Sequence, residues 1–192
     1  ESRAWNPASS RGEWENILEG AEAVINLSGE NIAEGRWTPE RKAHILKSRV
    51  DSTRAIVEAI GRRAHKPKLF INASAVGYYG PRGDGAIDES VGPGYGFLSK
   101  VCQAWEAEAV KAERHGVRTV RLRLGVVLGA EGGAFQKMLL PFRWGLGGPI
   151  GSGHQPMSWI SLEDLIRAIM FIFEREITNS KSNIADKTAQ LF

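Results

Sequence analysis

The sequence has 192 residues, of which 42% are hydrophobic and 24% are charged, and its formal net charge at pH 7 is +3. Lysine and arginine alternate with aspartate and glutamate along the chain, so no basic stripe indicates a nucleic-acid partner. No segment approaches the roughly 18 consecutive apolar residues of a membrane span. We therefore expect a single globular domain over residues 1–192, with neither a nucleic acid nor a membrane as partner.

Cysteine and histidine are too sparse for a disulfide framework or a metal centre. Cys102 is the only cysteine, so an intrachain disulfide is excluded, which fits a reducing compartment. We expect a cytoplasmic location, with an organelle as the alternative. The four histidines, His44, His65, His115 and His154, lack the spacing of metal ligands, and we expect no zinc site.

The first half of the chain alternates predicted helices and strands. The expected elements are a short amphipathic helix at 13–19, a strand at 21–29, a long helix at 38–63, an apolar strand at 68–74 and a glycine-rich loop at 76–85. Thr38 suits the N-cap of the long helix, Pro39 its first position and Gly61 its end.

The second half continues the alternation. We expect a helix at 96–114, a β-branched strand at 117–129, a helix at 133–147 that Pro141 interrupts, and a segment at 158–176 in which a short strand precedes a helix starting near Ser161. Strands that alternate with helices predict an α/β fold, a doubly wound parallel sheet with helices on both faces.

Ligands of such sheets bind outside the carboxyl ends of the strands. Three junctions between a strand and a loop turn from apolar residues to glycine, serine or asparagine: NLSGEN at 26–31, NASAVGYYG at 72–80 and LGVVLG at 124–129. These residue types let a backbone approach a ligand closely, although tight turns need them too. The recurrence at three junctions indicates a binding site there.

The segment GYGFLSKVCQAWE at 94–106 raises the question of a tyrosine–lysine acid–base pair, in which the lysine lowers the pKa of the phenol. Tyr95 and Lys100 are five residues apart, which on a helix separates them by about 140°. The position four before Lys100 is Gly96. The pair can meet only if Tyr95 lies before the helix; otherwise the segment is a structural helix whose apolar stripe Glu108 interrupts.

Six motifs carry a family resemblance: VINLSGENIAEGRW, SRVDST, SAVGYYG, RLRLGVVLG, KMLLPFRWGLGGPIGSGHQPMSWI and LEDL, in that order. They resemble the epimerase-like branch of the atypical short-chain dehydrogenase/reductases over nearly the whole chain, most specifically at 139–160. The resemblance implies a Rossmann fold, NADP(H) as cofactor and a small-molecule substrate, either a nucleotide sugar or a small carbonyl compound. Relatives are labelled both sugar epimerases and cell-division factors, so a cofactor-binding regulator without catalysis is the alternative. A homodimer stays open.

The resemblance also implies catalytic roles in the loop after the second strand. Ser74 matches the serine or threonine that hydrogen-bonds the reacting carbonyl, although its hydroxyl could instead cap local backbone. We hypothesise that one of Tyr78 and Tyr79, or water, supplies the proton; we assign Tyr79 to this role and Tyr78 to the substrate, and one of the two tyrosines is expected to pack instead. Tyr95 and Lys100 remain the displaced alternative to these donors.

Cofactor and substrate contacts follow from the same resemblance. The candidates for the cofactor are Leu27, Ser28, His44, Arg49, Ser74, Gly125 and Val127. A guanidinium suits phosphate or ribose recognition, whereas a solvated helical charge is the alternative for Arg49. Val127 also fits plain core. His154 and Trp159 are expected to border the substrate pocket, although a lone histidine is more often structural.

Two departures from the family pattern affect the expected function. The family begins with a glycine-rich loop that cradles the pyrophosphate, whereas this sequence opens where it resembles the family about 40 residues in, after that loop. NIADKTAQLF resembles only the beginning of the substrate-binding region, which we expect to start near residue 130. We therefore expect very weak NADP(H) binding by this chain alone, and a truncated inactive product is a further alternative. The sequence does not decide between NADP and NAD as cofactor, because the segment that recognises the 2′-phosphate is absent from it.

Overall fold

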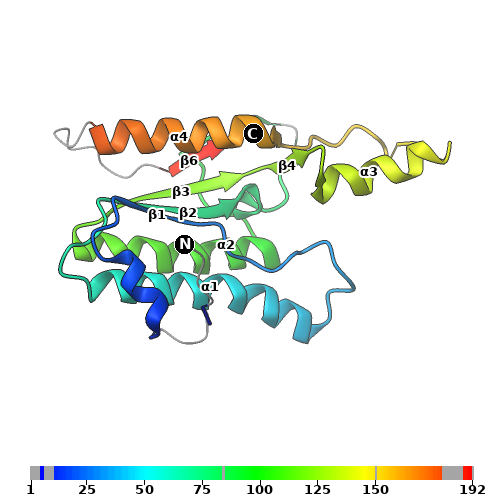
Figure 1. Ribbon diagram of the computed structural model, residues 1–192. Coiled ribbons are helices and arrows are strands. Elements are labelled where there is room, and N and C mark those ends of the chain that lie inside the picture. Colours follow the sequence, from blue (N-terminus) through cyan, green and yellow to red (C-terminus); the bar gives the residue numbers. More distant parts are fainter. Residues whose placement is uncertain (1–4, 7–10, 84, 150, 179–187, 192) are drawn as a thin grey trace.

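A four-stranded parallel sheet forms the centre of the computed structural model, which describes residues 5–6, 11–83, 85–149, 151–178 and 188–191. Its strands are β1 (Ala23–Asn26), β2 (Leu69–Ala75), β3 (Arg118–Leu124) and β6 (Thr188–Leu191), neighbours in that order. Helices α1 (Pro39–Gly61) and α2 (Phe97–Ala109) cover one face, and α4 (Leu162–Thr178) covers the other (Figure 1). The predicted parallel sheet with helices on both faces is confirmed.

Local sequence signals determine where α1 begins and ends. The side chain of Thr38 accepts a hydrogen bond from the amide of Arg41 at 3.2 Å, so it caps the first turn. Pro39 is the first helical residue and Gly61 the last. All three positions were expected from the sequence. Proline in particular suits the first helical position, because it loses no hydrogen bond there.

Two apolar cores lie on the two faces of the sheet, and β2 contributes to both. Phe70 packs with residues of α1 in the first core. Leu69 and Ile71 point to the opposite face, where they pack with Leu165 and Ile169 of α4. This alternation follows from the two-residue period of a strand that is buried on both sides.

The segment at 117–129 does not form the one strand that we predicted. Gly125 separates β3 from β4 (Val126–Gly129), which leaves the main sheet and pairs in parallel with β5 (Trp159–Ser161). A Cβ atom on Gly125 would lie 2.7 Å from both the carbonyl carbon and the oxygen of Ser158. The close crossing of these two backbones therefore requires glycine at the point where the chain changes sheets.

Three helical predictions also need correction. The short helix at 13–19 is the 3-10 helix η1 (Glu13–Leu18), and the helix expected at 96–114 is α2 followed by the 3-10 helix η3 (Val110–His115). Pro141 lies inside α3 (Gly133–Arg143) without interrupting it. The exposure of α3 explains this, since water can satisfy the carbonyl that loses its amide partner.

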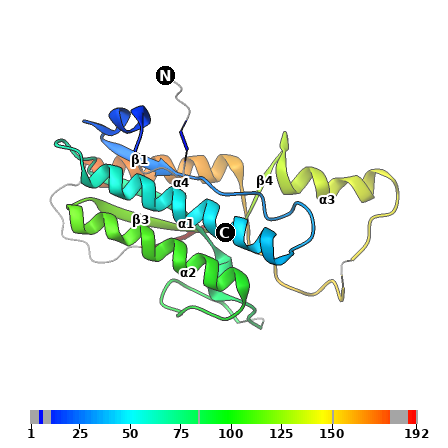
Figure 2. The same cartoon turned by 90° about the horizontal axis from the view of Figure 1, so that it is seen from below.

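The helix α3 extends away from the sheet in both views, whereas α1 and α2 run side by side along it (Figure 2). No helix among the described residues combines the length and the apolar character that crossing a bilayer would require.

Candidate functional site

The three predicted junctions lie at one edge of the sheet. Asn26 of β1 is in register with Asn72 of β2, and Ser74 of β2 is in register with Arg123 of β3. The 3-10 helix η2 (Val76–Tyr79) follows β2 directly. Because all these strands are parallel, their carboxyl ends bring the loops after β1, β2 and β3 together.

A buried hydrogen-bond network fixes the ends of β1 and β2 to the helices below. The Asn26 amide donates to Asn72 Oδ1 at 2.7 Å and to Thr53 Oγ1 at 3.0 Å. Thr53 in turn donates to Asn72 Oδ1 at 3.3 Å and accepts from Trp105 Nε1 at 2.9 Å. Since every donor has an acceptor, the network holds α1 and α2 in one position against the sheet.

A second buried network centres on an arginine–glutamate pair. Arg123 of β3 donates through Nε and Nη2 to the two carboxylate oxygens of Glu106 on α2, each at 2.9 Å. Ser74 Oγ donates to Glu106 Oε1 at 2.6 Å, and Arg123 Nη1 donates to Tyr79 Oη at 2.9 Å. All four residues are at most 3% exposed. The bidentate pair thereby fixes both Ser74 and Tyr79.

Burial and hydrogen bonding determine the protonation of Tyr79. Burial raises its pKa above the usual value, and the hydrogen bond from Arg123 only partly offsets this. The phenol therefore keeps its proton at neutral pH. Its oxygen accepts from Arg123, and no residue in the described part of the chain accepts the phenol proton, so Tyr79 is available as a hydrogen-bond donor.

Ser74 and Tyr78 are positioned by the same network. Because Ser74 donates its proton to Glu106, its oxygen offers lone pairs to any further partner. The ring of Tyr78 lies over the guanidinium of Arg123, 3.5 Å from the ring centroid to Cζ. Its carbonyl accepts from Ser99 Oγ at 2.8 Å, which ties η2 to α2.

Tyr95 and Lys100 lie outside this network. Gly96 is the N-cap of α2, so Tyr95 precedes the helix, and its side chain is 73% exposed. The side chain of Lys100 is exposed as well. Within the described residues, neither side chain forms a hydrogen bond or an ion pair. The geometry therefore gives the pair no mutual contact through which the lysine could act on the phenol.

Arg49 supplies a half-buried cation beside the end of β1. It donates to the carbonyls of Ile45 at 3.1 Å and Glu30 at 3.0 Å, and its guanidinium lies 5.3 Å from the Trp105 ring centroid. Burial lowers its pKa below the usual value. No carboxylate of the described residues lies within ion-pair distance of it. This cation thus lies at the predicted ligand edge without a direct ion-pair partner among the described residues.

The other predicted cofactor residues differ in exposure. Leu27 is 56% exposed and Ser28 is half-buried, with its amide bonded to Asn26 Oδ1 at 3.1 Å. His44 is an exposed residue of α1. Val127 is half-buried and packs against the core on the α4 face. Leu27 and Ser28 therefore lie directly after β1, where a ligand could reach their backbone.

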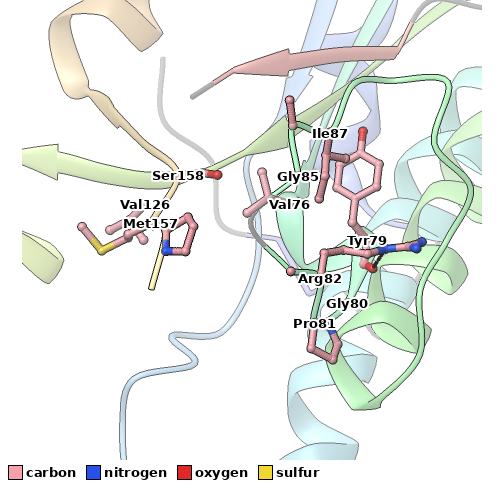
Figure 3. A pocket seen from close by; sticks show the side chains of 13 residues that line it. Val76, Tyr79, Gly80, Pro81, Arg82, Gly85, Ile87, Val126, Met157 and Ser158 are labelled. Carbon is pink, nitrogen blue, oxygen red and sulfur yellow. Dashed lines mark hydrogen bonds between the residues drawn. The ribbon is translucent and has the colours of Figure 1, made fainter. Parts of the chain in front are cut away.

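A cavity of about 610 Å³ lies between the loop after β2 and the segment that leads into β5 (Figure 3). Its lining comprises Val76, Tyr79, residues 80–83 and 85–87, Val126 and residues 156–158. Tyr79 is thus the predicted catalytic residue that borders it, whereas Ser74 lies outside its described lining. His154 and Trp159 are exposed and are not part of this lining either.

Glu106 and Arg123 were not predicted as site residues. A usable signal was present in RLRL at 121–124, where arginine alternates with leucine. A central strand of a doubly wound sheet is covered on both faces, so an arginine there needs a buried carboxylate. Glu106, which interrupts the sequence VCQAWEAEA on the adjacent helix, was the candidate.

We predict that Cys102 will resist thiol reagents in the folded protein. The residue is 4% exposed, and burial together with the charge of Glu106 raises its pKa to about 11. Ellman's reagent at about pH 8 should label the native chain roughly 100-fold more slowly than the chain unfolded in guanidinium chloride. Equal rates would contradict this prediction.

The same shift gives the sign of a pH effect on stability. The folded pKa lies above the ordinary value of 9.0, so the unfolded chain ionises first. The contribution of this thiol to stability is complete below pH 9.0 and declines as the pH rises through about 11.

Comparison with known proteins gives a consistent result. The model of the NAD dependent epimerase/dehydratase family matches residues 8–185. An epimerase family protein of Mycobacterium leprae is 39% identical over 180 residues, which are 94% of this chain and 58% of that protein. The chain thus spans little more than half the length of this relative.

Solved structures show the same similarity. The crystal structure of the human epimerase family protein SDR39U1 with NADPH superposes with a TM-score of 0.80 at 34% identity, covering 93% of this chain and 60% of that one. A nucleoside-diphosphate sugar epimerase of Corynebacterium glutamicum gives a TM-score of 0.74 at 31% identity, covering 94% and 36%.

Proposed function

The chain belongs to the NAD dependent epimerase/dehydratase family, and from this we propose that it forms part of an NADP(H)-dependent oxidoreductase or epimerase acting on a carbonyl or hydroxyl group. The observation that carries the proposal is the guanidinium of Arg49, which lies at the carboxyl end of β1 and forms no direct ion pair with a carboxylate of the described residues. The similarity to a human family member whose structure contains NADPH supports the choice of cofactor.

The residues at this edge fit a nicotinamide dinucleotide. Arg49 would meet a phosphate or ribose, since its charge is already held in place and lacks a carboxylate. Leu27 and Ser28 would offer backbone atoms to the adenosine half, and Gly125 and Val127 would border the nicotinamide. When bound, the cofactor would supply or accept a hydride.

Tyr79 and Ser74 would handle the proton in this reaction. The Tyr79 phenol keeps its proton and can donate it to a carbonyl oxygen, and Arg123 would stabilise the phenolate that remains. Ser74 offers lone pairs, so it would accept a hydrogen bond from a substrate hydroxyl. Glu106 holds Ser74 directly and Tyr79 through Arg123, which makes it a positioning residue.

The proposal predicts that Arg49→Met weakens NADPH binding. We expect a loss of roughly tenfold or more in affinity, because a hydrogen bond to a charged group contributes about 1.5–3 kcal/mol. NMR titration of the isotope-labelled chain with NADPH measures the affinity, since this method detects weak binding. Lys47→Met is the matched control: it removes one exposed positive charge from the same helix and should leave the affinity unchanged.

Equal affinities for the two variants, with thermal unfolding showing both folded, would contradict a role for Arg49. Absence of any NADPH-induced shift at the amides of Leu27 and Ser28 would contradict a cofactor site on this chain.

A second candidate is a cofactor-binding regulator without catalysis. The exposure of Tyr95 and Lys100 favours it, because they form no acid–base pair. Such a regulator would bind NADP(H) without turning over any substrate of a broad panel of carbonyls and alcohols. For either function, we propose that the segment from about residue 130, including the extended α3, begins the substrate-binding region.

A further inference from the structure

The cavity beside η2 has an apolar character on both of its walls. One wall carries Val76, Pro81 and Ile87, and the facing wall carries Val126 and Met157 (Figure 3), while Pro156 also belongs to the lining. Hydrocarbon of this kind favours apolar ligand surface, and a hydroxyl buried against it without a partner loses free energy. A volume of about 610 Å³ is sufficient for a small organic molecule.

The cavity offers little to an anionic ligand. Arg82 is the one cationic side chain in the described lining. Its Nε donates to the carbonyl of Tyr79 at 3.1 Å, and its Nη2 donates to that of Gly92 at 3.2 Å. Figure 3 shows its side chain extending away from Val126 and Met157. Arg82 therefore holds the loop together, and a diphosphate inside the cavity would lack a cation to pair with.

The polar groups of the lining suit one small functional group. Tyr79 carries a phenol proton that no described residue accepts. Ser158, on the opposite wall, holds its backbone in place by accepting from the Val126 amide at 2.8 Å, and its hydroxyl forms no hydrogen bond within the described residues. These are the side-chain hydroxyls of the described lining, and so few polar groups match a carbonyl or alcohol better than the many hydroxyls of a sugar.

We propose that this cavity binds an uncharged, largely apolar ketone, aldehyde or alcohol, and that the reacting oxygen of such a molecule meets Tyr79. The substrate class is thereby a hydrophobic carbonyl compound and not a nucleotide sugar. This inference rests on the proposed function for the reaction, whereas binding to the cavity can be measured independently of it.

NMR titration of the full chain with benzylacetone and, separately, with UDP-glucose tests the proposal. Benzylacetone should shift the amides of Val76, Tyr79 and Val126 in a saturable manner, and UDP-glucose should not. Met157→Asp should weaken benzylacetone binding roughly tenfold, because it introduces a charge beside hydrocarbon. Met138→Asp is the control, since Met138 is a similarly exposed methionine on α3 that is not part of the described lining.

Each outcome separates this inference from the proposed function. UDP-glucose shifts at these amides, no shift with benzylacetone, or equal weakening by both variants would overturn the proposed substrate class. An NADPH titration that shifts the amides of Leu27 and Ser28 while benzylacetone fails would leave the proposed function standing alone. Failure of NADPH with retained benzylacetone binding would overturn the proposed cofactor site and leave the cavity assignment intact.

Discussion

Replacing Glu106 by alanine is expected to lower the free energy of unfolding by about 3–5 kcal/mol, because it leaves Arg123 as a buried charge without its carboxylate partner. Both side chains are 3% exposed, and two hydrogen bonds of 2.9 Å join them. Ser74 would lose its acceptor at the same time. Urea denaturation followed by circular dichroism measures the effect.

Two further variants make this prediction specific. Glu106→Ala combined with Arg123→Met should recover part of the loss, since Arg123 no longer remains as a buried charge; Arg121, 3.6 Å from the Glu106 carboxylate, still loses that partner. Glu108→Ala on the same helix should cost only about 1 kcal/mol, because its partners Arg54 and Lys111 are 45% and 44% exposed. A similar loss for Glu106→Ala and Glu108→Ala would show that burial of the pair contributes little.

Gly94→Ala is expected to destabilise the protein through a direct overlap with the backbone of Tyr79. A Cβ atom at this position would lie 1.9 Å from the carbonyl oxygen of Tyr79 and 2.4 Å from its carbon. Both atoms belong to the backbone, so no change of rotamer relieves the overlap. We expect the free energy of unfolding to fall by about 3 kcal/mol, which for a chain of this size lowers the melting temperature by about 6–12 °C.

Gly92→Ala provides the matched control for that prediction. Gly92 lies in the same loop, and an added Cβ would meet no atom within 4 Å. Its melting temperature should therefore stay close to that of the unchanged chain. If Gly94→Ala also melted at the original temperature, the loop could not cross η2 as closely as described.

Much of the fold was predictable because local signals and the tertiary structure agree. Thr38, Pro39 and Gly61 mark the ends of α1, and the alternation of strands and helices indicates the parallel sheet. The division at Gly125 was not predictable, since the β-branched run continues on both sides of it. Only the crossing with the Ser158 backbone, far along the chain, determines that the strand changes sheets.

The candidate site was predictable at the level of its location. The junctions after β1, β2 and β3 lie together, because carboxyl ends of parallel strands share one edge. The charges beneath that edge were not predicted, because Glu106 and Arg123 look like surface residues until both faces of the sheet are covered. Gly96 at the N-cap places Tyr95 before the helix, the one position from which it could meet Lys100, yet the side chain of Tyr95 is 73% exposed and forms no hydrogen bond or ion pair within the described residues.

The two faces of the sheet differ in how far they depend on buried hydrogen bonds, with a consequence for how the protein can evolve. The α1–α2 face combines its apolar core with directional hydrogen bonds, in which Thr53 alone bonds with Asn26, Asn72 and Trp105. The α4 face depends mainly on apolar contacts, together with the pair of Arg118 and Glu176. Substitutions of similar volume can accumulate one at a time under α4, whereas under α1 and α2 a change in one partner demands a compensating change in another.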